Sequence, residues 1–238
     1  MNHWDRFARA SSDMPKSIRR IDVHRSQAPS VSPRRPVVLV VDDEISVRES
    51  LQLLLDCVGL RSASFASADD FLVHPRPMVP SCLLLDVNLP DLNGLDLQKQ
   101  VGADRVEMPI IFKTGFADIP MTVQAMKAGA VEFLTKPLND EMLLGVIQQA
   151  LERSRALLDD EDDLYSVRGR YACLNRRESE VMAPVVSGLL NKQVGGELGI
   201  SEITVKAHRG SVMRKMEASS LPHLVKMAAR LGLPGTRR

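Results

Sequence analysis

The stretch CLLLDVNLP at residues 82–90 constrains the fold of this chain more than any other. Its apolar part is unbroken and ends in a carboxylate, Asp86, which turn-forming residues follow. Such a run predicts a β-strand that is buried on both faces, as in a parallel sheet covered by helices. Ligands of open parallel sheets bind at the carboxyl ends of the strands. Asp86 is therefore expected at a functional site.

Short apolar runs and helical patterns alternate on both sides of this strand. The other strands are predicted at residues 37–41, 61–65, 109–113 and 131–134. Helices are predicted at residues 45–58, 68–73, 94–101, 119–128 and 139–155. Because a helix joins each strand to the next, the five strands are expected to be parallel. Residues 37–155 should form an α/β domain with a doubly wound, flavodoxin-like sheet.

Residues 173–238 predict a second, all-α domain of four helices. The helices are expected at residues 175–187, 192–198, 201–216 and 219–231. Asn175 and Glu178 have the spacing of a capping box, Gly199 ends the second helix, and Ser201 caps the third. Two helices joined by a tight turn at residues 198–201 are typical of a helix-turn-helix.

The charges indicate that the two domains have different partners. Residues 37–155 contain 10 basic and 17 acidic residues, whereas residues 173–238 contain 11 basic and 5 acidic ones, which favours nucleic acid as a partner of the second domain. Residues 1–36, rich in Ser, Arg and Pro, predict a disordered basic tail. Residues 156–172 contain an acidic run and form either a continued helix or an acidic linker, of which the linker is favoured.

Cysteine usage and hydropathy disfavour an exported or membrane protein. Cys57, Cys82 and Cys173 are far apart without a metal-ligand spacing, so ordinary thiols in a reducing compartment are expected. No apolar run has the length of a membrane span, and the N-terminus carries charges where a signal peptide needs an apolar core. We expect a cytoplasmic protein without a membrane partner.

Polar side chains stand at the ends of four of the predicted strands. Asp42 and Asp43 follow the first strand, Asp86 the third, Thr114 the fourth and Lys136 the fifth. These ends converge in a parallel sheet, and three carboxylates in one crevice repel one another unless a cation such as Mg²⁺ joins them. Asp86 could then attack a phosphoryl group, with Thr114 and Lys136 stabilising charge on the transferred oxygens.

The motifs around these residues are similar to those of a known family. VVDDE (40–44), LLLDVNLPDLNG (83–94), KTG (113–115) and PMTVQAMKAGAVEFLTKP (120–137) resemble a two-component receiver domain. LLNKQVGGELGISEITVKAHRGSVMRKM (189–216) resembles the LuxR-type helix-turn-helix. Together they resemble the FixJ subfamily of response regulators. The resemblance implies a transcription regulator, not an enzyme, that a sensor histidine kinase phosphorylates, that then forms a homodimer, and that binds double-stranded DNA to activate transcription.

The resemblance also implies roles for residues of the receiver. Asp86 would be the phosphoacceptor. The Mg²⁺ ligands would be Asp42, Asp43, Asp86 and the main-chain carbonyl of Asn88. Lys136, joined to Pro137 by a cis bond, would form a salt bridge with the phosphoryl group, while Thr114 and Phe133 would move on phosphorylation.

The third helix of the second domain is the expected recognition helix. Its apolar residues Ile203, Val212, Met213 and Met216 are expected to face the core. Lys206, Ala207 and Gly210 are implied by the resemblance to face the DNA groove, and His208 to contact DNA or pack nearby. The candidates for phosphate contacts are Lys192, Thr204, Arg209, Arg214 and Lys215.

Several residues depart from the family pattern. Lys113 stands where an apolar residue is usual, and strand alternation is expected to point it away from the phosphate side. Phe116 replaces a polar residue. Pro184 is expected to interrupt the first helix of the second domain, and the pair Gly195-Gly196 to cost about 1 kcal/mol per glycine, so that a marginally stable domain is predicted.

Two other functions stay open at this point. A receiver that has lost its chemistry would leave a DNA-binding regulator independent of phosphorylation. An aspartyl-nucleophile phosphatase would need a second aspartate two residues after Asp86, where this chain has Asn88.

Overall fold

The computed structural model describes residues 35–90, 92–115 and 118–233. The predicted disordered tail lies outside these residues, except for residues 35 and 36, and so does Phe116. Among the residues described, no helix is long and apolar enough to cross a bilayer. All three cysteines are free thiols, Cys82 in the core and Cys57 and Cys173 at the surface.

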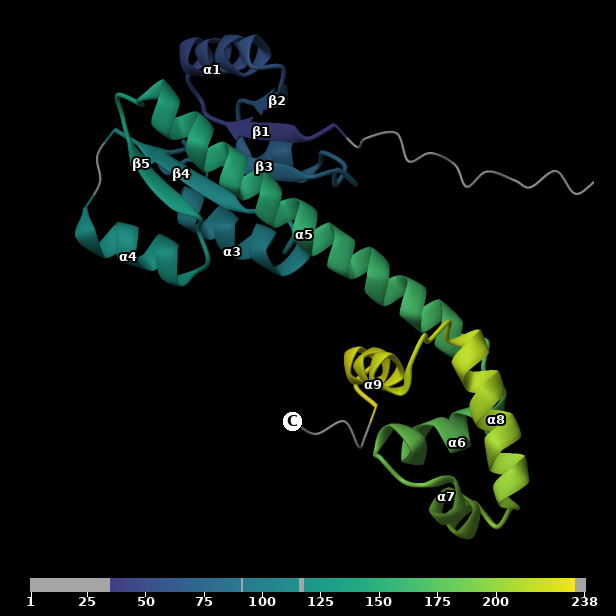
Figure 1. Ribbon diagram of the computed structural model, residues 1–238. Coiled ribbons are helices and arrows are strands. Elements are labelled where there is room, and N and C mark those ends of the chain that lie inside the picture. Colours follow the sequence, from purple (N-terminus) through teal and green to yellow (C-terminus); the bar gives the residue numbers. More distant parts are fainter. Residues whose placement is uncertain (1–34, 91, 116–117, 234–238) are drawn as a thin grey trace, which may run out of the picture. The chain divides into compact units, whose positions relative to one another are not determined.

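The N-terminal domain is built on a five-stranded parallel sheet (Figure 1). Its strands are β1 (Val37–Val41), β2 (Arg61–Phe65), β3 (Ser81–Asp86), β4 (Ile110–Thr114) and β5 (Glu132–Thr135). They lie in the order β2-β1-β3-β4-β5. The chain adds β2 on one side of β1 and the later strands on the other side, so the strand order reverses between β1 and β3. This confirms the predicted fold, and it puts the end of β3 at the topological switch point, where such sheets bind ligands.

Helices cover both faces of this sheet (Figure 1). The first layer comprises α1 (Ile45–Cys57) and the start of α5 (Asp140–Ala172), the second α2 (Ala68–Leu72), α3 (Gly94–Asp104) and α4 (Ile119–Lys127). Val40 and Leu84 point into the first layer, whereas Val41 and Leu85 point into the second. All six residues of β3 are buried, as its apolar run predicts.

A glycine brings α3 close to the end of β3. A Cβ at Gly94 would lie 2.6 Å from the main-chain oxygen of Asp86 and 3.0 Å from Cα of Val87. The Gly94 N–H instead donates a hydrogen bond to the Val87 carbonyl at 2.9 Å, and Asn93 caps the helix. The turn after Asp86 is therefore held tightly against the sheet.

The helix α5 corrects the sequence analysis of residues 156–172. These residues continue α5 to Ala172, so the helical alternative is correct and the favoured linker is wrong as a description of their structure. Leu158 and Val167 are both buried, on opposite sides of the helix, while Glu161 in the acidic run forms an ion pair with Arg76 at 3.1 Å. The acidic side chains of residues 159–163 are exposed, so solvent screens their repulsion, while apolar side chains of the same helix are buried.

The C-terminal region comprises α6 (Arg176–Val186), α7 (Asn191–Leu198), α8 (Glu202–Lys215) and α9 (Leu221–Arg230), which enclose their own apolar core. Both bonds of the predicted Asn175–Glu178 capping box are present, and Ser201 caps α8. Gly199 takes the left-handed conformation, with φ of 65°, between α7 and α8. The predicted helix-turn-helix is confirmed.

Two expectations for this region, those for Pro184 and Ile203, need correction, and the glycine pair divides into one required and one replaceable residue. Pro184 does not interrupt α6, because it lies in the last turn, where the helix is about to end. A Cβ at Gly195 would meet the Ile200 carbonyl at 2.7 Å, whereas one at Gly196 would have no neighbour within 4 Å, so only the first glycine is required. Ile203, expected in the core, is 82% exposed, and Val205 occupies the core instead.

Candidate functional site

The strand register brings Asp42, Asp86 and Lys113 to one side of the sheet. Asp86 pairs in register with Lys113, and residues paired across parallel strands share a face. Val40 pairs with Leu84, so Asp42 and Asp86, each two residues further on, also share that face. Lys113 thus points toward the carboxylates, and the expectation that it points away was wrong. Its neighbour Thr114 lies on the opposite face.

Two lysines are shared between two buried carboxylates at this site. Lys113 Nζ lies in direct contact with Asp42 Oδ2 and 3.4 Å from Asp86 Oδ2. Lys136 Nζ lies 2.7 Å from Asp86 Oδ2 and 3.6 Å from Asp42 Oδ2. The Lys113 and Asp42 side chains are fully buried and that of Asp86 is 5% exposed, whereas Lys136 is 24% exposed. We call these four side chains the strand-end cluster.

The other carboxylate oxygens of the strand-end cluster accept main-chain hydrogen bonds. Asp42 Oδ1 accepts from the Glu44 N–H at 2.7 Å, and Asp86 Oδ1 accepts from the Asn88 N–H at 2.9 Å. Each of the four oxygens thus has a donor or an ammonium group beside it. Both carboxylates are held in one orientation as a result.

Burial and charge affect the two lysines differently. Burial, followed by the charge on Lys136, lowers the pKa of Lys113 to about 7. Contact with Asp42 and Asp86 acts in the opposite direction, because a neighbouring carboxylate favours the ammonium form. For Lys136, burial also lowers the pKa, but the hydrogen bond and charge of Asp86 and then those of Glu44 raise it above its ordinary value.

The remaining predicted receiver residues lie around the cluster. Thr114 ends β4 and is buried, and Phe133 on β5 packs against Phe112 with ring centroids 5.9 Å apart. The Lys136-Pro137 peptide bond is cis, as predicted. Thr114 and Phe133 are both on the opposite side of the sheet from Lys113, with the core that α3 and α4 cover.

The predicted Mg²⁺ ligands do not fit a metal as they are arranged. Asp43 is exposed, but the Oδ2 atoms of Asp42 and Asp86 face the ammonium groups of Lys113 and Lys136. Arg48 donates to the main-chain carbonyls of Asp42 at 2.6 Å and Asp43 at 2.8 Å, which adds positive charge. In the described part of the chain, no three His, Cys, Asp or Glu side chains are grouped to hold a metal ion.

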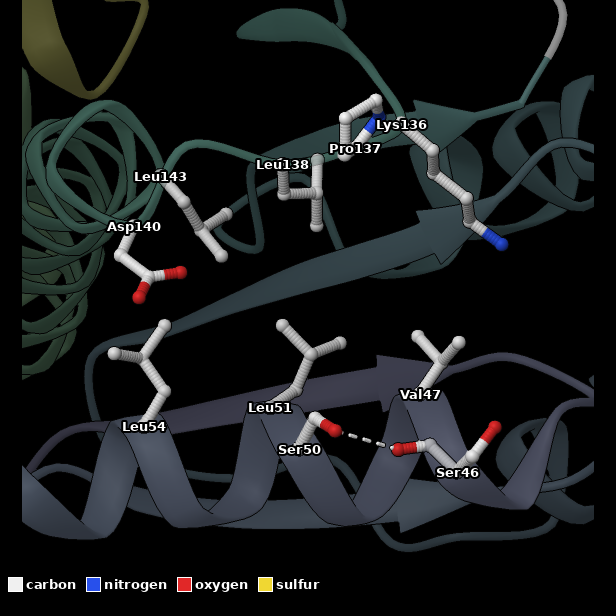
Figure 2. Close-up of a pocket in the computed structure, with 10 residues that line it drawn as sticks. All are labelled: Ser46, Val47, Ser50, Leu51, Leu54, Lys136, Pro137, Leu138, Asp140 and Leu143. Carbon is white, nitrogen blue, oxygen red and sulfur yellow. Dashed lines mark hydrogen bonds between the residues drawn. The ribbon is translucent and has the colours of Figure 1, made fainter.

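A groove adjoins the strand-end cluster between α1 and the start of α5 (Figure 2). Its volume is about 410 Å³. Leu51 and Leu54 on α1 face Leu138 and Leu143 across it, and Lys136 lies at one end (Figure 2). The open side of the cluster is therefore continuous with a partly apolar surface.

The predicted DNA-binding residues divide about equally between exposed and half-buried positions. Lys192 on α7 and Lys206, Ala207, Gly210 and Arg214 on α8 are exposed. Thr204, His208, Arg209 and Lys215 are half-buried. Arg209 donates to Asn191 Oδ1 at 3.1 Å, which orients it beside α7.

Lys215 has partners inside the domain. Its Nζ lies 2.7 Å from Glu178 Oε2 and donates to the Cys173 carbonyl at 3.2 Å. Ser211 donates to Glu178 Oε1 at 2.6 Å, and the Asn175 N–H donates to Oε2 at 2.8 Å. We call Asn175, Glu178, Ser211 and Lys215 the α6–α8 cluster. These contacts tie Lys215 to α6, so a phosphate contact by this residue stays only a prediction.

Sequence reasoning places two residues of functional interest, Lys113 and Ile203, wrongly, and the sequence contains a signal that corrects the second of them. The assignment of Lys113 needed the pairing of β4 with β3, which a count along one strand does not supply. Ile203 lies two residues before the buried Val205, which is about 200° around a helix. Counting from Val212 back by seven residues would have selected Val205 for the core.

The fold and the two clusters define a receiver domain with a helix-turn-helix output domain, the organisation of a two-component response regulator. Family models agree: residues 38–148 match the response regulator receiver domain, and residues 172–228 match the bacterial regulatory proteins of the luxR family. The chain belongs to the FixJ-like two-component response regulators, which are DNA-binding transcription regulators.

Individual relatives match over most of their length. Nodulation protein W of Bradyrhizobium diazoefficiens is 47% identical over 84% of this chain and 88% of its own. The transcriptional regulatory protein FixJ of Rhizobium meliloti is 42% identical over 80% of this chain and 94% of its own. The solved structure of the response regulator StyR is 42% identical, with a TM-score of 0.73 over 82% of this chain and 99% of its own.

Proposed function

We propose that a partner sensor histidine kinase phosphorylates this protein on Asp86 and that phosphorylation controls its binding to DNA. The observation that carries this proposal is the position of Asp86, a buried carboxylate at the switch point whose Oδ2 lies 2.7 Å from Lys136 Nζ. A nucleophile beside an ammonium group that reaches solvent is suited to attack a phosphoryl group.

The proposed transfer conserves atoms and charge. A carboxylate oxygen of Asp86 forms a bond to phosphorus as the P–N bond of the kinase phosphohistidine breaks, and its electron pair stays on the imidazole nitrogen, which takes a proton. Lys136 stabilises charge on the phosphoryl oxygens. Thr114, whose side chain lies on the other face of the sheet at the end of β4, moves to donate a hydrogen bond to one of them. Phe133 turns inward as Thr114 moves.

The output is proposed to be a homodimer on double-stranded DNA. Apolar side chains stand exposed on α4 and α5, among them Val123 at 44%, Met126 at 41% and Met142 at 55%. A second copy that covers this α4–β5–α5 face would bury them. Two copies of α8 would then enter the major groove at half-sites about one helical turn or a multiple apart, in the cytoplasm, where the chromosome lies.

Contacts to DNA are proposed for the exposed face of α8. Lys206, Ala207 and Gly210 reach base edges, and Lys192, Thr204, Arg209 and Arg214 contact phosphates, with His208 near the groove. Ile203 joins this set, because an exposed apolar side chain in the first turn of α8 can contact a thymine methyl group. The regulator is proposed to activate transcription.

The intact mass of the full chain after incubation with acetyl phosphate tests the proposal. Wild type should gain the mass of one phosphoryl group, and so should the control D96N, which changes an exposed aspartate of α3. D86N should gain none. Wild type should also bind promoter DNA more tightly after phosphorylation, and D86N should not. Equal labelling of D86N and wild type would contradict the assignment of Asp86.

A second function is favoured by one observation. Lys113 contacts both Asp42 and Asp86 and neutralises their charge, as in a site that is held in one state without a phosphoryl group. A receiver silenced in this way would leave a regulator that binds DNA without phosphorylation. Wild type without a phosphoryl gain, and with unchanged DNA affinity, would establish this alternative.

A further inference from the structure

We propose that Lys113 is a built-in cation that takes the place of a divalent metal ion between Asp42 and Asp86. Receiver domains generally bind Mg²⁺ where these carboxylates meet, and here an ammonium group of the chain itself lies there. The consequence is weak Mg²⁺ binding by this receiver. A second consequence, phosphorylation of Asp86 that needs no Mg²⁺, rests on the function proposed above.

The first argument is the occupancy of the carboxylate oxygens. The Oδ1 atoms of Asp42 and Asp86 accept main-chain N–H groups, and their Oδ2 atoms face Lys113 and Lys136. A metal ion that bridged the two Oδ2 atoms would lie where the Lys113 ammonium group now lies. Binding of Mg²⁺ therefore requires that this group leave.

The second argument is that Lys113 has no route to solvent. Its side chain is fully buried in β4, whereas Lys136 is 24% exposed at the rim of the site. Long side chains vacate a site by moving the charged head into water. Lys136 can do this and Lys113 cannot without movement of the strand, so the carboxylates keep Lys113 as their partner.

The third argument is the charge of the strand-end cluster. With Lys113 in its ammonium form, the two carboxylates and two ammonium groups already balance, and only Lys136 among the four is more than 5% exposed. Addition of a divalent ion would leave an excess of two positive charges on these four side chains, and Arg48 adds a third nearby. The neighbouring carboxylates, Asp43 and Glu44, of which Glu44 lies 3.3 Å from Lys136, are exposed and offset this charge only from the solvent side. Unbalanced buried charge is strongly unfavourable.

The test is calorimetric titration of the full chain with MgCl₂. K113M keeps the length of the side chain and removes its charge, and K113I is a second variant whose β-branched side chain suits a buried strand. K99M is the matched control, because Lys99 is 60% exposed on α3. We expect weak binding to wild type and K99M, and about tenfold or greater tightening in K113M and K113I.

A thermal melt accompanies each titration. Mg²⁺ should raise the unfolding midpoint of K113M or K113I and leave that of wild type unchanged, since a ligand stabilises only the state that binds it. Wild-type binding as tight as that of the variants overturns the inference. If both variants fail to fold, the wild-type titration decides alone: tight Mg²⁺ binding overturns the inference, and no binding supports it.

Phosphorylation with acetyl phosphate in EDTA separates this inference from the proposed function. The Asp86 oxygen–phosphorus bond forms while the phosphorus–oxygen bond to acetate breaks and acetate leaves. Labelling of wild type that persists in EDTA supports both, and labelling abolished by EDTA overturns the metal-free chemistry. No labelling with or without Mg²⁺ rejects the proposed function, while the calorimetry still decides whether Lys113 excludes the metal.

Discussion

The strand-end cluster and the α6–α8 cluster both pair buried carboxylates with lysine, yet they differ in origin and access. In the α6–α8 cluster, one carboxylate, Glu178, accepts hydrogen bonds from a capping partner three residues away and from two residues of α8. In the strand-end cluster, two carboxylates and two lysines come from four different segments of the sheet. One lysine of that set reaches solvent at the switch point.

The difference shows that the position of a carboxylate–lysine pair in the fold, and not its chemistry alone, decides what the pair does. Hydrogen bonds from Lys215, Ser211 and the Asn175 N–H lower the pKa of Glu178 to about 2 and hold α6 to α8. The strand-end cluster instead concentrates charge where a ligand can enter. We therefore expect changes in the α6–α8 cluster to affect stability alone. Changes in the strand-end cluster should affect both stability and phosphorylation.

The largest expected effect is that of D42N in the strand-end cluster. This change leaves buried Lys113 with one carboxylate, Asp86 at 3.4 Å, which Lys136 already shares, and this should cost about 3–5 kcal/mol of receiver stability. Urea unfolding followed by hydrogen exchange resolves the receiver from the C-terminal region. The exposed neighbour gives the control D43N, expected within about 0.5 kcal/mol of wild type. A double variant D42N/K113M that is no more stable than D42N would contradict the pairing.

In the α6–α8 cluster, E178Q should lower the unfolding midpoint of the C-terminal region and leave phosphorylation of Asp86 unchanged. Gln keeps an acceptor for the Asn175 N–H but loses the charge that pairs with Lys215. The control E180Q removes a carboxylate whose partners, Arg176 and Arg177, lie on the exposed side of α6. Calorimetric melts should show a clearly larger shift for E178Q; equal shifts would refute the buried role of Glu178.

Acid should remove the difference in stability between wild type and E178Q. The folded-state pKa of Glu178 lies below its unfolded value, 4.5, so its contribution to stability is complete above pH 4.5 and is lost as pH falls toward about 2. Melts between these values should show wild type converging on E178Q. A difference between them that stays constant with pH would argue against the ion pair.

A glycine pair tests how closely α7 approaches the start of α8. G195A should destabilise the C-terminal region by about 1–3 kcal/mol, because the added Cβ would meet the Ile200 carbonyl at 2.7 Å. G196A on the same helix should stabilise it by up to about 1 kcal/mol, because its Cβ has free space. Chemical denaturation measures both; opposite signs are expected, and a gain for G195A would exclude the close approach.

The smallest expected effect is that of I203S. Ile203 is 82% exposed, so its removal should change stability by less than about 0.5 kcal/mol in denaturant melts. Val205→Ala is the contrast, since Val205 is fully buried, and it should cost more. DNA affinity is the second measurement: I203S should weaken binding without loss of fold, and a stability loss equal to that of V205A would return Ile203 to the core.

The sequence by itself determined most of the elements and which polar side chains stand at the ends of the strands. Strand β3 and Asp86 at its end followed from an apolar run, and the capping box followed from Asn175 and Glu178 because its bonds join residues three apart. The turn of the helix-turn-helix followed from Gly199 and Ser201, because the end of α7 and the cap of α8 also depend on neighbouring residues. Contacts of this kind depend on the local backbone, so the order of residues suffices to predict them.

Only the tertiary structure decided what lies beside Asp86. Lys113 contacts Asp42 and Asp86 because β4 pairs with β3 in one register, and a shift of one residue would have turned it to the opposite face. The choice between Gly195 and Gly196 likewise depends on where Ile200 passes. The register of β4 against β3 and the approach of one backbone segment to another depend on parts of the chain that pack together. A single stretch of sequence therefore does not determine them.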